Sequence, residues 1–85
     1  MDKFDTLVND ERERQEDKWG EQNHNPTLWL AILLEEVGEF ASELIANEWK
    51  PELQRRADAG NELIQIAAVA KAIWESGVRN NWIST

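Results

Sequence analysis

NPTLWLAILLEEVGE, residues 25–39, combines a helix start, a wholly apolar run and a group of acids. Asn25 followed by Pro26 is typical of an N-cap and the first helical position, so we predict that a helix begins there. Residues 28–34 are apolar on every side of that helix, and such a segment has to be covered from more than one direction. Two other helices of one chain can hardly provide that cover.

The residues before this stretch predict a first helix over residues 2–19. Apolar side chains at helical spacing begin it, and the same stripe turns polar towards its end. Residues 20–25 have the composition of a loop and separate the first helix from the second. The stripe consists of Phe4, Leu7, Val8, Glu11, Gln15, Lys18 and Trp19.

The residues after the stretch predict where the second helix ends and a third begins. The second helix is expected to end near Asn47, because Pro51 disfavours helical geometry in the residue before it. The third helix is expected from about Pro51 to Ser76, with Gly77 as its C-terminal cap. Gly60 is a weak point inside it, costing about 1 kcal/mol relative to Ala.

The predicted fold class is all-α, with one domain over residues 1–85, three main helices and a short C-terminal segment. The chain has 4 Gly and 2 Pro, too few for the many turns of an all-β domain. We expect a second copy to cover the apolar run and complete a four-helix bundle, as a homodimer or a tetramer of two dimers. A compact three-helix monomer is the alternative. The tail carries Trp82 and Ile83 and is a candidate for docking on a neighbouring subunit.

Composition excludes several classes of function. The 17 acidic and 9 basic residues give a net charge of -8, which repels a phosphate backbone, so we expect no nucleic-acid partner. No stretch reaches the roughly 20 apolar residues of a membrane span, and the N-terminus lacks the plan of a secretory signal, so we expect a cytoplasmic protein without membrane contact. The chain has no Cys, which leaves no thiols for disulfides or zinc–thiolate sites.

Acidic side chains gather on one stripe of the second helix, about 100° wide. The stripe consists of Glu35, Glu36, Glu39 and Glu43. On the third helix, Glu62 lies on the apolar side formed by Ile66, Val69, Ala70 and Ile73. A carboxylate on an apolar face has to be paired, protonated or bound to a metal. The alternatives are a solvated acidic face, and for Glu62 a salt bridge to Arg55 of another chain.

Two acidic stripes that face each other would bring several carboxylates together, which cations must neutralise. Oxygen ligands without Cys or His favour Mg²⁺ or Mn²⁺. Mg²⁺ keeps several waters and prefers a few carboxylates plus substrate phosphates, so the pattern points to a phosphoanhydride substrate. A di-iron centre would need a Glu-x-x-His pair on each of two helices, whereas the single histidine, His24, lies in the loop.

Two strings carry a resemblance to a known family. Glu35-Glu36-Val37-Gly38-Glu39 and the later Glu62-Leu63-Ile64-Gln65 resemble the EExxE and ExxD signature of the MazG-like all-α nucleoside triphosphate pyrophosphohydrolases. Flanking residues resemble the short phage- and mobile-element-type members over nearly the whole chain. These are Glu11-Arg12, Gln15, Lys18-Trp19-Gly20, Gln22, His24, Trp29-Leu30 and residues 62–70.

The resemblance implies hydrolysis of a (deoxy)nucleoside triphosphate between its α and β phosphates, yielding the monophosphate and pyrophosphate, as house-cleaning of the nucleotide pool. It also implies Mg²⁺, held by Glu36, Glu39 and Glu62. Glu35 is implied as a further ligand or as the catalytic base for the attacking water.

The chain departs from the family signature at one position of the implied metal site. Gln65 stands where the family usually has aspartate. Its amide oxygen can ligate Mg²⁺ but brings no charge. Asp58, one turn before Glu62, is the alternative source of the missing carboxylate.

Further residues are candidates for substrate binding. Basic side chains would touch phosphates, and we single out Lys18 on the inward stripe of the first helix and Lys71 or Arg55 on the third. Trp19 and Trp29 would stack on a base, or else belong to the core. Polar loop residues would hydrogen-bond a base edge, and these are Gln22, Asn23 and His24. The competing class is a catalytically inactive helical interaction module.

Overall fold

The computed structural model describes residues 2–46 and 53–85. Over these residues it contains helices and no strand, which confirms the all-α prediction. The elements are α1 (Lys3–Trp19), α2 (Pro26–Ala41), the π-helical turn η1 (Ser42–Ala46) and α3 (Leu53–Arg79).

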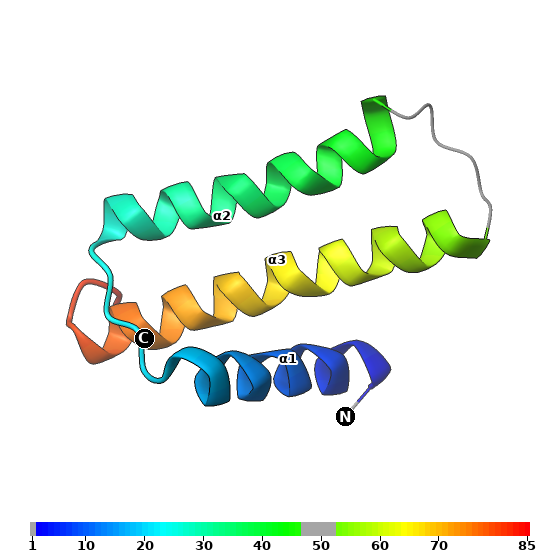
Figure 1. The fold of residues 1–85 in the computed structure, drawn as a ribbon. Helices are drawn as coiled ribbons and strands as arrows, with labels where there is room; N and C mark the ends of the chain where they lie inside the picture. Colours follow the sequence, from blue (N-terminus) through cyan, green and yellow to red (C-terminus); the bar gives the residue numbers. More distant parts are fainter. Residues whose placement is uncertain (1, 47–52) are drawn as a thin grey trace.

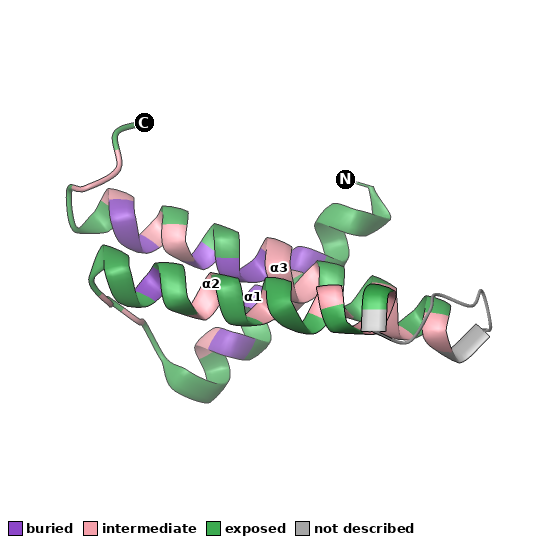
Figure 2. Cartoon of the chain, turned by 90° about the horizontal axis from the view of Figure 1, so that it is seen from above, coloured by how far each residue is buried: buried purple, intermediate pink, exposed green. Residues whose placement is uncertain are grey.

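Helix α3 is the central element of the fold (Figure 1). Helices α1 and α2 both pack along α3, and within the described ranges they do not pack against each other. Figure 2 shows buried segments on all three helices. The buried apolar side chains are Val8, Trp29, Ala68, Val69 and Ala72. Most of these lie on α3 and are small, so α3 allows close approach of a helix on each side.

Side-chain caps explain where α1 and α2 begin. The Asn25 side chain accepts a hydrogen bond from the Leu28 N–H at 2.9 Å, and Pro26 occupies the first turn of α2. This confirms the predicted start of the second helix. The Asp2 side chain caps α1 in the same way, accepting from the Asp5 N–H at 2.8 Å.

Helix α2 continues into η1, one turn of π-helix over Ser42–Ala46. The sequence predicted an ordinary helix to about Asn47, so the change of helix type was not foreseen. The predicted break at Asn47, Lys50 and Pro51 lies outside the described residues. Gly60 does not interrupt α3, which is continuous across it.

The predicted end of the third helix was wrong. Helix α3 runs past Ser76 to Arg79, so Gly77 is not its cap. The αL residue is Asn81, with φ 64°, and the Trp82 N–H donates to the Gly77 carbonyl at 2.9 Å. The Asn81 N–H donates to the Val78 carbonyl at 3.3 Å, which completes a Schellman motif. Asn is one of the few residues other than Gly that adopt this backbone geometry. The prediction placed the helix end at Gly77 because it considered only Gly for this position.

Within the chain, the C-terminal tail folds back on its own helix. The Ile83 N–H donates to the Gly77 carbonyl at 3.1 Å, and the Ile83 side chain lies directly over Gly77. Gly77 is buried in a position where any side chain would overlap Ile83.

A Gly77→Ala substitution is therefore expected to lower the free energy of unfolding by about 1–3 kcal/mol, because the added methyl group displaces Ile83. The matched control is Gly60→Ala, since no atom lies within 4 Å of a methyl group placed there. This control should stabilise the helix by about 0.5–1 kcal/mol. Urea unfolding followed by circular dichroism compares the two, and equal stabilisation by both would contradict the packing of the tail.

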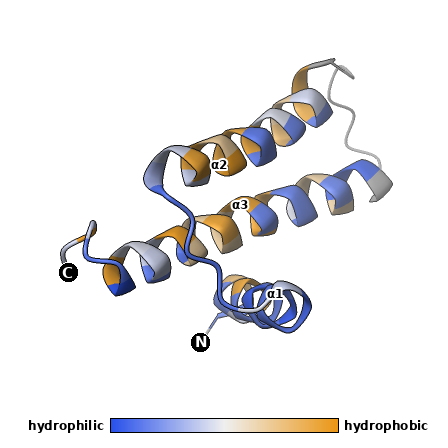
Figure 3. Cartoon of the chain, turned by 60° about the vertical axis from the view of Figure 1, so that its left-hand side comes forward, coloured by the Kyte–Doolittle hydropathy of each residue, from blue (hydrophilic) through white to orange (hydrophobic). Residues whose placement is uncertain are grey.

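The apolar run of α2 remains open on one side in the single chain. Leu30 and Leu34 are 53% and 57% exposed, and Trp74 of α3 is 51% exposed. Figure 3, which colours the ribbon by hydropathy, shows hydrophobic segments along both helices. Large exposed apolar side chains of α2, η1 and α3 include Leu30, Leu34, Val37, Ile45, Leu63 and Trp74. None of the described helices combines the length and hydropathy needed to cross a membrane.

Candidate metal centre and adjoining pocket

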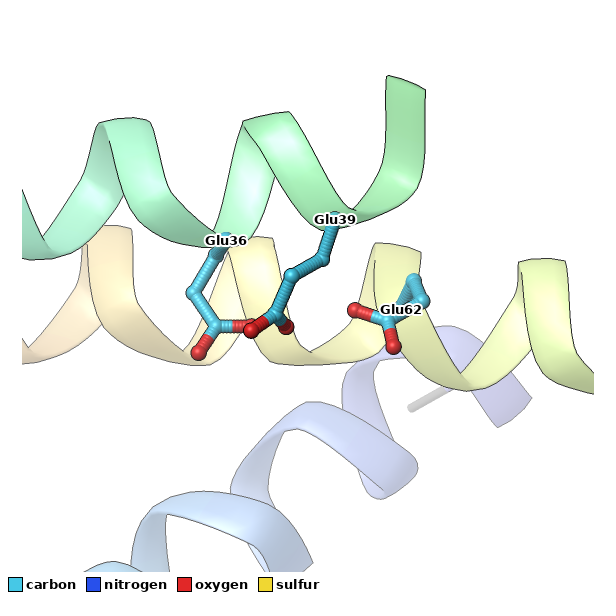
Figure 4. Close-up of side chains that lie close together, drawn as sticks. All are labelled: Glu36, Glu39 and Glu62. Carbon is cyan, nitrogen blue, oxygen red and sulfur yellow. The ribbon is translucent and has the colours of Figure 1, made fainter. Parts of the chain in front are cut away.

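Three carboxylates from two helices converge between α2 and α3 (Figure 4). Glu36 and Glu39 lie one turn apart on α2, and Glu62 faces them from α3. One oxygen of each lies within 4.8 Å of the others. The structure thus brings together the three residues that the sequence marked as metal ligands, and we call them the acidic triad.

The charged forms of Glu36 and Glu62 are disfavoured in the triad. The pKa of Glu62 is raised, first because burial disfavours its charged form and then because of the nearby charges of Glu39, Glu43 and Asp58. The pKa of Glu36 is raised by burial and by the charges of Glu39, Glu62 and Glu35. Both pKa values are raised, and a bound cation would lower them again because it stabilises the charged carboxylates.

One oxygen of the triad has no partner. Glu62 Oε2 is buried, and of the buried side-chain polar atoms in residues 2–46 and 53–85 it alone lacks a hydrogen-bond partner. Within the chain, Arg55 Nη1 lies 3.6 Å from Glu43 Oε1. An unpartnered buried carboxylate oxygen costs free energy unless a cation or a proton occupies it. The donor set therefore fits a hard divalent ion such as Mg²⁺.

The raised pKa values predict how stability depends on pH in the absence of metal. Above pH 4.5 the folded chain retains protons on Glu36 and Glu62 that the unfolded chain releases, so the free energy of unfolding should fall as pH rises through the folded pKa values. We expect the free energy of unfolding of the Glu62→Gln variant to decrease less steeply with rising pH. Urea midpoints in EDTA, from pH 4.5 to neutrality, provide the measurement.

The pKa of Glu11 is shifted in the opposite direction, so Glu11 affects stability in a different pH range. Its pKa is lowered, chiefly by a hydrogen bond from Arg14, so its stabilising contribution is present above pH 4.5 and is lost below it. Wild-type and Glu62→Gln proteins should therefore differ in slope only above pH 4.5. Identical slopes there would contradict the raised pKa of Glu62.

The remaining predicted site residues lie around the triad and not within it. Glu35 is exposed and contributes only its charge to Glu36. Asp58 is half-buried and acts on Glu62 through its charge. Gln65 lines a pocket together with Glu36.

A pocket of about 170 Å³ adjoins the triad and shares Glu36 with it. We call it the groove pocket, because it lies where α1 and α2 flank α3 without packing on each other. Its walls come from all three helices and from the loop after α1. The lining residues are Gln15, Trp19, Gln22, Trp29, Ile32, Glu36, Gln65, Val69 and Ala72.

Three of the predicted substrate-binding residues line this pocket. Trp19 is 53% exposed and Gln22 is half-buried, so both have faces open to a ligand. Trp29 is 3% exposed and donates its Nε1–H to Ser76 Oγ at 3.2 Å. Trp29 is therefore a core residue that also forms part of the pocket wall. His24 packs edge-on against Trp29, with ring centroids 4.8 Å apart, and does not line the pocket.

The two predicted phosphate-binding lysines are directed elsewhere. Lys18 is exposed, and its Nζ lies 4.9 Å from the centroid of the Trp19 ring, so it does not lie on an inward stripe. Lys71 is exposed and donates to Asn9 of α1. Asn23 accepts hydrogen bonds from Arg79, which ties the loop to the end of α3. The position of a long side chain on a helix face does not determine where its charged end lies, so the sequence could not predict these contacts.

Arg12 is a buried residue that sequence reasoning missed. It is 9% exposed and lies 2.7 Å from Glu75 of α3 and 2.6 Å from Glu16 of α1. The signal was present, because Arg12 follows Val8 by four residues and precedes Gln15 by three, which places it on the buried side of α1. A charged residue in that register calls for a partner on the opposite helix.

Comparison with known proteins gives no relative for this chain. No family model, no curated protein and no solved structure matches it.

Proposed function

We propose that this protein is a Mg²⁺-dependent nucleoside triphosphate pyrophosphohydrolase, which cleaves a (deoxy)nucleoside triphosphate to the monophosphate and pyrophosphate. The observation that carries the proposal is the buried, unpartnered Glu62 Oε2 within a triad whose Glu36 also lines a pocket. The resemblance of its EExxE and downstream Glu to the MazG-like enzymes supports the same function.

Each part of the site has a proposed task. The acidic triad holds the divalent ions, Mg²⁺ or Mn²⁺, and Gln65 adds a neutral oxygen ligand or else positions the substrate. When bound, Mg²⁺ supplies positive charge to the phosphate oxygens and lowers the pKa of the attacking water. Glu35, next to Glu36 on α2, accepts the proton of that water.

The groove pocket is the proposed seat of the nucleoside. Trp19 offers an exposed aromatic face on which a base can stack, and Gln22 lies beside it. No Lys or Arg is among the residues that line the pocket. The phosphates therefore belong at its acidic end, where metal ions and not side chains neutralise them.

We further propose that a second copy of the chain covers the exposed apolar face of α2 and α3, giving the four-helix bundle expected from the sequence. Exposed side chains such as Leu34 and Trp74 would then be buried, as the hydrophobic effect favours. Sedimentation equilibrium tests this, and Leu34→Glu should shift the dimer, or a tetramer made from it, to monomer. A wild-type protein that is monomeric at micromolar concentration would overturn the assembly but not the metal site.

The activity is tested with a panel of canonical and modified nucleoside triphosphates in Mg²⁺, with pyrophosphate and orthophosphate release measured separately. We expect pyrophosphate as the first product, together with the monophosphate. Orthophosphate as the first product would place the cut at another bond and contradict the proposal. No hydrolysis and no effect of Mg²⁺ plus a non-hydrolysable nucleotide on thermal stability would favour the inactive helical module instead.

A further inference from the structure

A row of apolar residues runs along the outer side of α3, and we call it the α3 seam. It consists of Leu63, Ala67, Ala70 and Trp74. Their spacings of four, three and four residues place them within a stripe about 60° wide. Leu63 is 46% exposed and Trp74 is 51% exposed. This spacing is that of the contact positions of a coiled coil, which pack against another helix.

Helix α2 carries a row with the same spacings, which we call the α2 seam. It consists of Leu30, Leu34, Val37 and Ala41. Its three large side chains are between 40% and 57% exposed. Residues of the same helices that line the groove pocket, such as Ile32 of α2 and Ala72 of α3, lie on the opposite sides of these helices from the seams. Both seams therefore face away from the pocket.

The α3 seam is symmetrical about the point between residues 68 and 69. Ala67 and Ala70 are equally distant from this point, and so are Leu63 and Trp74. In an antiparallel pair of identical helices, residues related in this way lie opposite each other. The small alanines would let α3 approach its own copy closely at the centre, while Leu63 and Trp74 would fill the space at each end.

The α2 seam has a matching centre between residues 35 and 36, with Leu34 and Val37 on either side. Trp29 contacts Ser76 near one end of the helix pair, and Glu39 meets Glu62 near the other. By interpolation, the centre of the α2 seam lies opposite residue 67. It is thus within about 3 Å of the level of the α3 centre, and one two-fold axis can cross both.

A hollow of about 360 Å³ lies beside one end of the α3 seam. Leu63 lines it together with Phe4 and Leu7 of α1, which are 47% and 41% exposed. Gly60 also lines it, and no atom of the described residues lies within 4 Å of a methyl group placed there. In the antiparallel arrangement, Trp74 of the second copy comes next to Leu63 and therefore next to this hollow.

The exposed area is sufficient for a stable dimer. The large side chains of the two seams leave about half of their surface exposed. In two copies of the chain they amount to on the order of 1,000 Å² of apolar surface, and the residues around the hollow add to this. The total reaches the lower limit of about 1,200 Å² for a stable protein interface.

We propose that a second copy of the chain docks antiparallel on both seams, about a two-fold axis through their centres, with Trp74 of each copy entering the hollow of the other. This inference rests on the assembly proposed above and specifies its geometry. Because the seams face away from the groove pocket, both pockets lie on the outer faces of this dimer. Each acidic triad is complete within one chain, so the partner supplies no residue to it.

The test measures distances between nitroxide spin labels on single cysteines, which the absence of native Cys makes unique. Ala57→Cys and Lys71→Cys place labels at exposed positions of α3. With a rise of 1.5 Å per residue, we expect about 35 Å between the two chains for the label at position 57. For the label at position 71, close to the axis, we expect less than about 20 Å. A parallel dimer would bring both pairs of labels within about 20 Å.

Sedimentation equilibrium tests the contribution of Trp74. Trp74→Ala should raise the dissociation constant of the dimer at least about thirtyfold, as for a tryptophan at the core of an interface. Trp19→Ala is the matched control, because Trp19 is equally exposed, at 53%, but lines the groove pocket. This control should leave the dissociation constant unchanged.

A short distance at position 57, a long distance at position 71, a monomeric wild-type protein or an unchanged dissociation constant in Trp74→Ala would each overturn the inference. Hydrolysis is measured separately from assembly. The expected distances in a protein that hydrolyses no triphosphate would refute the proposed activity and leave this inference standing.

Discussion

The Glu39→Gln variant is expected to lose hydrolysis by at least about a hundredfold while keeping its helical content. Glu39 is the exposed member of the acidic triad, so its replacement by an isosteric amide leaves the packing between α2 and α3 intact. The loss follows because metal ions supply several kcal/mol of charge stabilisation to a phosphoryl transition state, and the variant lacks one anionic ligand.

A second measurement separates metal binding from general damage to the protein. Wild-type protein should gain thermal stability in Mg²⁺, whereas Glu39→Gln should gain much less. Without metal the variant should melt no lower than wild type, since the raised pKa values of Glu36 and Glu62 show that Glu39 repels both. Asp17→Asn, an exposed change of the same charge on α1, is the control. Full activity in Glu39→Gln would remove the triad from the mechanism.

Trp29→Ala is expected to lower the free energy of unfolding by about 3–5 kcal/mol, as for other large-to-small substitutions of buried aromatic residues. Trp29 is 3% exposed, and its Nε1–H donates to Ser76, which is fully buried in α3. The substitution leaves a cavity between α2 and α3 and removes the stronger of two hydrogen bonds to the Ser76 hydroxyl, which also accepts from Asn80 Nδ2 at 3.4 Å. For a chain of this size that loss is a large part of the whole stability.

Two comparisons identify the source of that loss. Ser76→Ala, which leaves only the Trp29 N–H without a partner, should cost about 1–3 kcal/mol. Trp19→Ala removes an indole that is 53% exposed and should cost less than about 1 kcal/mol. Urea unfolding at one fixed protein concentration measures all three, because self-association would make stability depend on concentration. Similar losses for Trp19 and Trp29 would contradict the assignment of Trp29 to the core.

The sequence predicted the elements whose signals are local. The cap at Asn25, the start at Pro26 and the spacing of Glu36 and Glu39 depend on neighbours within one or two turns. For Glu62, the cost of burying a charge predicted only that it is paired, protonated or bound to a metal, and its grouping with Glu36 and Glu39 was implied by the family resemblance. Helix geometry and the cost of burying a charge are sufficient to predict features of this kind.

The features that were missed depend on contacts distant in the sequence. Lys71 donates to Asn9, and Arg12 reaches Glu75 across the interface between α1 and α3. Periodicity places such side chains on a face but does not name the partner. The end of α3 was misplaced for a related reason, since Gly77 serves to admit Ile83 and not to reverse the chain. A glycine that serves close packing and one that serves a turn look alike in a sequence.

The arrangement of α1 and α2 on opposite flanks of a shared α3 has a mechanical consequence. Within the described ranges the two outer helices have no direct backbone packing, and side chains of both line the groove pocket. A ligand bound in this pocket would contact both α1 and α2. It would thereby connect two helices that each pack against α3 but not against each other. Occupancy should therefore slow amide hydrogen exchange in α1 as well as in α2, even where the ligand makes no contact with the protected residues.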